Sequence, residues 1–236
     1  MLNGLDLFSG IGGLSVALSP WVIPRAYCEK EPYAQAVLLS RMRDGSIPWA
    51  PIWDDVRSLS ERMVGPEIDI IYGGFPCQDI STLGTKKGLE GERSGLFYEI
   101  TRLASDLNPT FIFLENVSKG FRKVEPQVFE ALEKIGYTAR AIEISAFSVG
   151  ANQERVRWFC LAHRNSEIIR VSAGRWERKG RPKETGIFSP AWWTTEPGIP
   201  GMAYGVPYRV DRHRAMGNAV VPLQAREAFK RLMGLE

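Results

Sequence analysis

The sequence predicts an α/β protein, in which a parallel sheet carries helices between its strands and a small loop-rich lobe is added late in the chain. Short aliphatic runs, such as Ile68–Tyr72 and Thr110–Leu114, are typical of strands buried on both faces. Amphipathic stretches with helical spacing, such as Phe97–Leu107, alternate with these runs. From His163 to Tyr208 glycine and proline are frequent and no helical period survives, which predicts the lobe.

Length and composition fit one sizeable core. The chain has 236 residues, of which 44% are hydrophobic and 24% charged, with a net charge of +3. This charge permits a polyanionic partner without demanding one. Three cysteines without a CxxC pair, and no secretory segment, predict a reducing cytoplasm and no metal site. No apolar run is long enough to span a bilayer, so we expect no membrane partner.

The first unit of the chain is a strand, a glycine-rich turn and a helix. Leu5–Phe8 is the predicted strand, Ser9–Gly13 the turn and Leu14–Leu18 the helix. Glycines let a ligand approach the backbone closely, and a helix N-terminus offers free N–H donors. The turn has neither the GxGxxG nor the GK[ST] pattern, which argues against a dinucleotide or a nucleoside triphosphate. It favours a ligand without a phosphate chain.

Acidic residues end the next two predicted strands. Trp21–Cys28 is followed by Glu29, and Asp55 ends a third short segment after a helix that Pro32 opens. A carboxylate after the second strand of such a unit can accept hydrogen bonds from ribose hydroxyls. Asp55 is suited to an adenine amino group. The structural alternatives are a helix cap for Glu29 and a turn cap for Asp55.

A lone cysteine follows the aliphatic strand Ile68–Tyr72, in the turn Gly73-Gly74-Phe75-Pro76-Cys77-Gln78. Ligands of open α/β sheets bind at the carboxyl ends of the strands, which makes Cys77 a candidate nucleophile. The alternative is a buried structural cysteine. The polar segment 79–94 carries several glycines and the cations Lys86, Lys87 and Arg93. It predicts a lid that closes over an anionic substrate.

Further polar groups are predicted at the same edge of the sheet. Thr110–Leu114 ends in Glu115-Asn116-Val117, so Glu115 lies at the tip of a second strand. After a helix over 125–135 and a strand over 137–144, the residues Gln153, Arg155 and Arg157 alternate along a further predicted strand. Their planar donors suit a base edge or a phosphate. The alternative is a solvated strand face with surface ion pairs.

The loop-rich lobe mixes basic and aromatic side chains, and a helix over 223–232 closes the chain. Such a mixture favours contact with a nucleic acid backbone and stacking on bases, although a solvated loop is an equal alternative. The side chains concerned are Arg164, Arg170, Arg175, Trp176, Arg178, Lys179, Arg181, Lys183, Trp192 and Trp193.

Five stretches, in this order, resemble the motifs of DNA (cytosine-5)-methyltransferases. They are Asp6–Gly13, Gly74–Gln78, Glu115–Val117, Gln153–Arg157 and Gly217–Pro222. The resemblance implies a Rossmann-like, S-adenosylmethionine-dependent methyltransferase sheet, mostly parallel, with helices on both faces and the C-terminal helix beside the first glycine turn.

The resemblance also implies a division of the chain. Residues 1–163 would form the catalytic region, 164–208 a target recognition region and 209–236 a C-terminal segment that packs back on the catalytic region. The recognition region is short for the family. The arginine-rich segment that usually ends it is replaced at most by Arg209-Val210-Asp211-Arg212.

The implied reaction moves a methyl group from S-adenosyl-L-methionine to C5 of a flipped-out cytosine in duplex DNA, leaving S-adenosyl-L-homocysteine. Cys77 would add to C6, Glu115 would protonate N3, and Arg155 and Arg157 would stabilise the adduct. Glu29 would hold the ribose and Asp55 the adenine. The implied cofactor residues are Phe8, Gly10, Gly12, Glu29, Asp55, Pro76, Asn218 and Val220. The implied substrate residues are Gln78, Ser81, Arg93, Asn116 and Gln153.

Other functions remain open at this point. An RNA cytosine-5 methyltransferase would have the same fold, and its structured RNA would need less recognition surface. A catalytically silent DNA-binding relative would have no need of Cys77, Glu115 and both arginines, all of which are present. A small-molecule methyltransferase would leave the basic lobe unexplained. We expect a monomeric enzyme of the cytoplasm of a bacterium or a phage-infected host, belonging to a restriction-modification system or acting alone.

Overall fold

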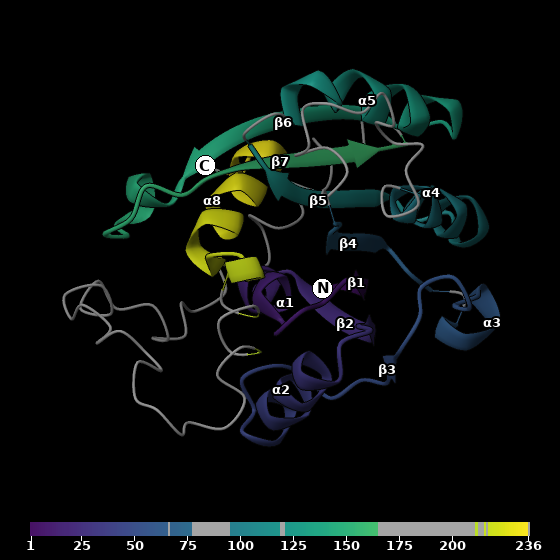
Figure 1. Ribbon diagram of the computed structural model, residues 1–236. Coiled ribbons are helices and arrows are strands. Elements are labelled where there is room, and N and C mark those ends of the chain that lie inside the picture. Colours follow the sequence, from purple (N-terminus) through teal and green to yellow (C-terminus); the bar gives the residue numbers. More distant parts are fainter. Residues whose placement is uncertain are drawn as a thin grey trace.

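The computed structural model describes residues 1–65, 67–76, 95–118, 121–164, 211, 215 and 217–235. A seven-stranded sheet of order β3-β2-β1-β4-β5-β7-β6 forms its centre (Figure 1). The strands are β1 (Leu2–Leu7), β2 (Val22–Cys28), β3 (Ile52–Trp53), β4 (Ile70–Gly74), β5 (Phe111–Val117), β6 (Thr138–Ser145) and β7 (Val156–His163).

The sheet is mostly parallel, as predicted. Strands β3, β2, β1, β4 and β5 are all parallel, whereas β7 is antiparallel to both β5 and β6. The chain runs outward from β1 to β3 and then returns to the other side of β1 to form β4. This reversal creates a topological switch point between β1 and β4, where the carboxyl ends of open α/β sheets bind ligands.

Helices cover both faces of the sheet, which confirms the predicted fold class (Figure 1). Alternate strand residues face opposite ways, so Ile71 belongs to one apolar cluster while Ile70 and Tyr72 belong to the other. Helices α4 and α5 pack on the first face, and α1 and α8 on the second. No helix in the described ranges is long and apolar enough to cross a membrane. The helices are α1 (Gly13–Leu18), α2 (Pro32–Arg43), α3 (Glu61–Val64), α4 (Leu96–Leu107), α5 (Glu125–Lys134) and α8 (Pro222–Met233), with 3₁₀ turns η2 (Phe121–Lys123) and η3 (Ala146–Val149).

The C-terminal segment returns to the first glycine turn, as the resemblance implies. A Cβ built at Gly13 would lie 2.8 Å from Cγ1 and 3.2 Å from the carbonyl oxygen of Val220. Arg226 on α8 donates from Nε to the carbonyl of Ala17 on α1, at 3.1 Å. The glycine at position 13 therefore permits close packing between the first and last parts of the chain.

One predicted strand is wrong at its start. β7 begins at Val156, and residues 153–155 precede it outside the sheet. Gln153 and Arg155 therefore do not alternate with Arg157 on one strand face. The carbonyl of Arg155 accepts the N–H of Ala146 across the end of the β6–β7 hairpin, at 3.0 Å. The Arg155 guanidinium is drawn instead to the carbonyls of Gly217 and Ala219 in the C-terminal segment. Residues 165–210, most of the predicted recognition region, lie outside the described residues.

A buried carboxyl group lies below the glycine turn. Asp6 on β1 has no exposed surface; Ser15 on α1 donates to its Oδ2 at 2.6 Å and shares a 2.7 Å hydrogen bond with the hydroxyl of Tyr72 on β4. Burial raises the pKa of Asp6 to about 7, although the bond from Ser15 opposes this rise. The folded protein therefore keeps a proton here that the unfolded chain releases near pH 3.8.

This carboxyl group predicts a pH-dependent stability. Because the native state binds more protons than the unfolded state between about pH 4 and pH 7, Asp6 makes folding less favourable as the pH rises through this window. An Asp6→Asn variant cannot ionise. Its melting temperature should therefore decline less between pH 5 and pH 8 than that of the wild type. Thermal unfolding of both proteins across this range is the measurement, and parallel curves would contradict the assignment.

Candidate active site

The glycine turn curls over the carboxyl end of β1. Phe8, Gly10 and Gly12 all have left-handed backbone conformations, with φ of 54°, 54° and 82°. Glycine adopts this conformation without a steric penalty, whereas Phe8 does so at a cost. The N–H of Gly10 donates to Oε2 of Glu29 at 2.7 Å, which ties the turn to the end of β2.

Two carboxylates end the neighbouring strands, and each is engaged with local backbone. Glu29 is 9% exposed, and its Oε1 accepts the N–H of Glu31 at 2.8 Å. Asp55 accepts the N–H of Arg57 at 3.0 Å through Oδ1. Since a carboxylate oxygen has two acceptor sites, these bonds leave both side chains able to accept further hydrogen bonds. The structural roles considered for these residues are thus compatible with ligand binding.

The turn before Cys77 needs its glycines for steric reasons. A Cβ built at Gly73 would lie 2.3 Å from the carbonyl oxygen of Leu7, and one at Gly74 would lie 2.8 Å from Oε2 of Glu115. Gly74 and Glu115 face each other in the parallel pair β4–β5. Glycine at position 74 therefore makes the space in which the Glu115 carboxyl group lies.

Glu115 forms a buried ion pair. Nε of Arg157, at the start of β7, lies 3.1 Å from Oε1 of Glu115. The side chain of Glu115 is 12% exposed and that of Arg157 is 16% exposed. Burial raises the pKa of Glu115 to about 7, and the opposing charges of Arg157 and Arg155 limit the rise. A carboxyl group with this pKa is part protonated near neutral pH. It can therefore donate a proton to a substrate atom.

Replacing Gly74 by alanine should disturb this pair. The added methyl carbon would lie 2.8 Å from Oε2, closer than a Cβ approaches other atoms, so the Glu115 carboxyl group must shift within its pair with Arg157. We expect the turnover number to fall on the order of 100-fold, as displacement of a catalytic group by about 1 Å can cause. Steady-state kinetics, with thermal unfolding as the control for folding, would measure this. A variant that is well folded and fully active would contradict the assigned packing.

Asn116 holds the backbone next to Cys77. Its side chain is buried; Nδ2 donates to the carbonyl of Phe75 at 3.1 Å, and Oδ1 accepts the N–H of Val117 at 2.8 Å. The predicted substrate contact of Asn116 thus competes with a structural role in holding the turn. Pro76 is half-buried at the end of this turn. The predicted site residues Cys77, Gln78, Ser81 and Arg93 lie outside the described residues.

The two other cysteines are unsuited to nucleophilic chemistry. Cys28 and Cys160 are both buried in the core that β1, β5 and β7 share with α4 and α5. Burial raises the pKa of Cys28 to about 12 and also raises that of Cys160. A thiol that is buried and protonated is inert. Any nucleophilic thiol in this chain is therefore Cys77.

Arg155 faces the C-terminal segment. Its Nη2 donates to the carbonyl oxygens of Gly217 and Ala219, at 2.8 and 2.6 Å. Burial lowers the pKa of Arg155, helped by the nearby charge of Arg157. Asn218, in the same segment, is exposed, as is Gln153 at the hairpin end. The fold thus brings the C-terminal segment, the glycine turn and the Glu115–Arg157 pair to one edge of the sheet.

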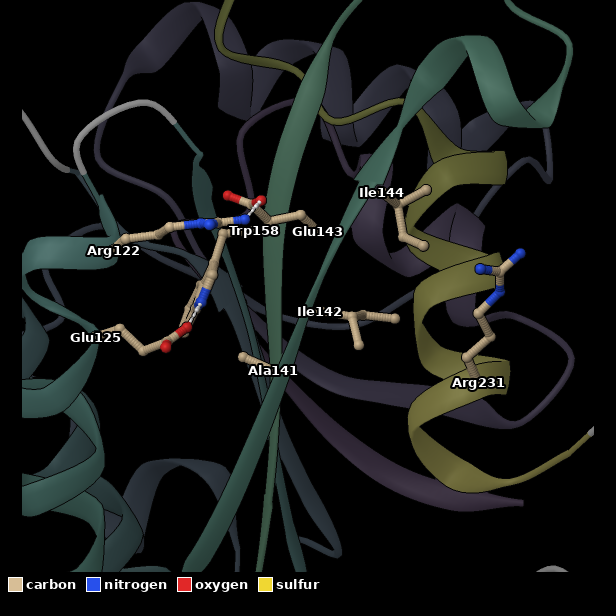
Figure 2. A pocket seen from close by; sticks show the side chains of 8 residues that line it. All are labelled: Arg122, Glu125, Ala141, Ile142, Glu143, Ile144, Trp158 and Arg231. Carbon is tan, nitrogen blue, oxygen red and sulfur yellow. Dashed lines mark hydrogen bonds and ion pairs between the residues drawn. The ribbon is translucent and has the colours of Figure 1, made fainter.

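A hollow at the β6 edge of the sheet shares none of these residues. Its polar groups have partners within the chain: Arg122 pairs with Glu143, Nε1 of Trp158 donates to Glu125 at 2.5 Å (Figure 2), and Arg231 pairs with Glu227. We assign no ligand to it. Its lining residues are Arg122, Glu125, Ala141, Ile142, Glu143, Ile144, Trp158 and Arg231.

Comparison with known proteins decides the family. The sequence model described as C-5 cytosine-specific DNA methylase matches residues 2–191. The chain belongs to this family. Type II methyltransferase M.CviJI of Paramecium bursaria Chlorella virus IL3A is 30% identical, over 95% of this chain and 58% of the relative. Type II methyltransferase M.HhaI of Haemophilus parahaemolyticus is 32% identical, over 70% and 50%.

A solved structure supports the fold of this family member. DNMT2 of Spodoptera frugiperda superposes with a TM-score of 0.56 at 22% identity, over 70% of this chain and 51% of that one. The present chain spans about half the length of the relatives it matches. The comparison confirms the expected family and the expected fold.

Some buried polar groups of the chain were not predicted from the sequence. Asp6 was seen only as part of the first motif, and Ser15 and Tyr72 only as members of a helix and a strand. Gln224 on α8 was not singled out. The one available signal was a charged residue inside an aliphatic strand, namely Asp6 between Leu5 and Leu7.

Proposed function

We propose that this chain transfers a methyl group from S-adenosyl-L-methionine to C5 of a flipped-out cytosine in duplex DNA. Given the family, one observation supports the proposal most directly. The buried pair of Glu115 and Arg157 lies at the carboxyl end of β5, against Gly74, which precedes Cys77 by three residues in the sequence. A part-protonated acid and a cation at one sheet edge, with a cysteine three residues beyond Gly74 in the sequence, are the groups that this reaction needs.

The glycine turn fits the adenosyl cofactor. A Cβ built at Gly10 would meet only the carbonyl oxygen of Phe8, at 4.0 Å, so the space over the turn is open among the described residues. Glu29 and Asp55 retain acceptor capacity for ribose hydroxyls and an adenine amino group. When bound, S-adenosylmethionine supplies the methyl group that C5 accepts. The residues assigned to hold it are Phe8, Gly10, Gly12, Glu29, Asp55, Pro76, Asn218 and Val220.

The chain's own groups activate the base. C5 of cytosine is a weak nucleophile; when the Cys77 thiolate forms a bond to C6, the electrons of the C5–C6 double bond become available at C5. Negative charge then develops towards N3 and O2. Glu115 donates its proton to N3, and Arg157 stabilises O2. Once C5 carries the methyl group, a base removes the C5 proton, the sulfur–C6 bond breaks and N3 returns its proton to Glu115, which restores the aromatic ring, the thiolate and the acid.

Duplex DNA is the proposed substrate because the relatives named above are type II methyltransferases and because the chain carries a basic, aromatic segment. The target cytosine must leave the helix, since C6 is inaccessible within the stack. Gln78, Ser81, Arg93 and Gln153 are assigned to substrate contact. Residues 1–163 form the proposed catalytic region and 164–208 the proposed target recognition region, with a monomer as the working unit.

The test is methyl incorporation. The 236-residue protein is incubated with methyl-tritiated S-adenosylmethionine and either mixed-sequence duplex DNA or transfer RNA. We expect label in the DNA, at 5-methylcytosine after nucleoside digestion, and none in the RNA. Label confined to RNA would replace the DNA proposal by the RNA alternative. Label in neither would overturn the proposed activity.

A further inference from the structure

The C-terminal segment and the start of β7 hold each other by reciprocal side-chain bonds. The Arg155 guanidinium donates to the carbonyls of Gly217 and Ala219. In return, the amide of Gln224 donates from Nε2 to the carbonyl of Arg155 at 2.6 Å, and to that of Ile144 at 2.6 Å. Each element thus supplies a side chain that binds the backbone of the other.

These contacts are placed to resist movement. Gln224 is fully buried on α8, and the Arg155 bonds to carbonyl oxygens are charge-assisted. The two Gln224 bonds and the Arg155–Ala219 bond are buried or partly buried, so little water competes with them, and their loss leaves backbone carbonyls unpaired. The two side chains therefore fix the position of residues 217–224 against the β6–β7 hairpin.

Residues 217–224 also touch the cofactor side of the site. Val220 packs so closely on Gly13 that a Cβ there would lie 2.8 Å from it. On the side of the segment that Arg155 contacts, Arg157 follows two residues later in the chain and pairs with Glu115. The segment thus contacts the glycine turn through Val220 and contacts Arg155, two residues before Arg157, through Gly217 and Ala219.

We propose that Arg155 and Gln224 are positioning residues that shape the cofactor pocket through residues 217–220. This inference rests on the proposed function. Arg155 has its Nη2 bound to two backbone carbonyls, so its effect on the reaction passes through the segment it holds. Arg157, by contrast, acts on Glu115 directly.

The test measures binding of S-adenosylhomocysteine by isothermal titration calorimetry, without DNA. The variants are Gln224→Met, which keeps the size of the side chain but loses both donors, and Arg155→Lys, which keeps the charge but loses the planar fork. The matched control is Arg122→Lys, at an exposed arginine that pairs with Glu143 at the β6 edge, away from residues 217–224. We expect the dissociation constant to rise about tenfold in the first two variants, as loss of one or two hydrogen bonds would cause. The control should stay within about twofold of the wild type.

Kinetics add a second readout. Gln224→Met should raise KM for S-adenosylmethionine while its kcat stays near that of the wild type. The double variant should bind no more weakly than the worse single variant, because both changes release one segment. Unchanged cofactor affinity in both folded single variants, as judged by thermal unfolding, would overturn the proposal. So would a loss of kcat alone. Failure of the wild-type protein to bind S-adenosylhomocysteine would instead count against the proposed function.

Discussion

Replacing Cys77 by serine should abolish methyl transfer, with a loss of about 10⁴-fold or more. A serine hydroxyl has almost no anionic fraction at neutral pH, whereas a thiol has a small one that nearby cations increase. No other cysteine can take over, because Cys28 and Cys160 are buried and their pKa values are raised. Affinity for S-adenosylhomocysteine should be close to normal, since the oxygen-for-sulfur change leaves the glycine turn intact.

A denaturing gel measures this directly. Duplex DNA with 5-fluorocytosine is incubated with protein and S-adenosylmethionine; fluorine cannot leave C5 as a proton does, so the covalent complex accumulates. The wild type should give a shifted band, and Cys77→Ser should give none. Cys160→Ala, which removes a buried thiol far from solvent, should keep the band. A band, or normal turnover, in the Cys77→Ser protein would refute the covalent mechanism.

The Glu115→Gln variant should lose most of the activity, roughly 10²- to 10⁴-fold, as removal of a general acid does. Glutamine has nearly the same shape as glutamate, so it still fits over Gly74, and its oxygen can still accept from Arg157. Its amide cannot deliver a proton to N3. The loss therefore reports proton transfer rather than packing.

The pH profile separates these two effects. Because burial raises the pKa of Glu115 to about 7, the acid form that donates the proton is lost as the pH rises through that value. The wild-type rate at saturating substrate should therefore fall above about pH 7, whereas the glutamine variant should lack this alkaline decline. Turnover measured from pH 6 to pH 9 tests the assignment. An unchanged rate, or a decline that survives in the variant, would remove Glu115 from the mechanism.

Local pattern predicted which polar residues and glycines lie at the carboxyl ends of the strands. Gly74 and Glu115 each end an aliphatic run, and parallel strands place their carboxyl ends at one edge of a sheet. The glycine turn, Glu29 and Asp55 were placed by the same reasoning, because strand, turn and helix are decided within about 20 residues of chain. Motif order then indicated the family, which the comparisons confirmed.

Tertiary structure alone decided which partner each polar group has. Arg155 was expected on a strand face beside the base, but it lies one residue before β7 begins. Its guanidinium binds the carbonyls of Gly217 and Ala219, which are 62 and 64 residues further along the chain. Asn116 binds the backbone of Phe75, 41 residues away. Nothing in the local sequence specifies such contacts, since they arise only when distant segments pack together.

The raised pKa values of Glu115 and Asp6 have the same origin. A carboxyl group has an ordinary pKa until the fold removes its water, and the depth of burial depends on every element that covers it. The sequence by itself determined the order of strands and helices along the chain, the polar residues that follow the strands, and the family. The packing of β4, β5, β7 and α8 decided the protonation state of Glu115 and the partner of Arg155, because desolvation and long-range hydrogen bonds are properties of the assembled core.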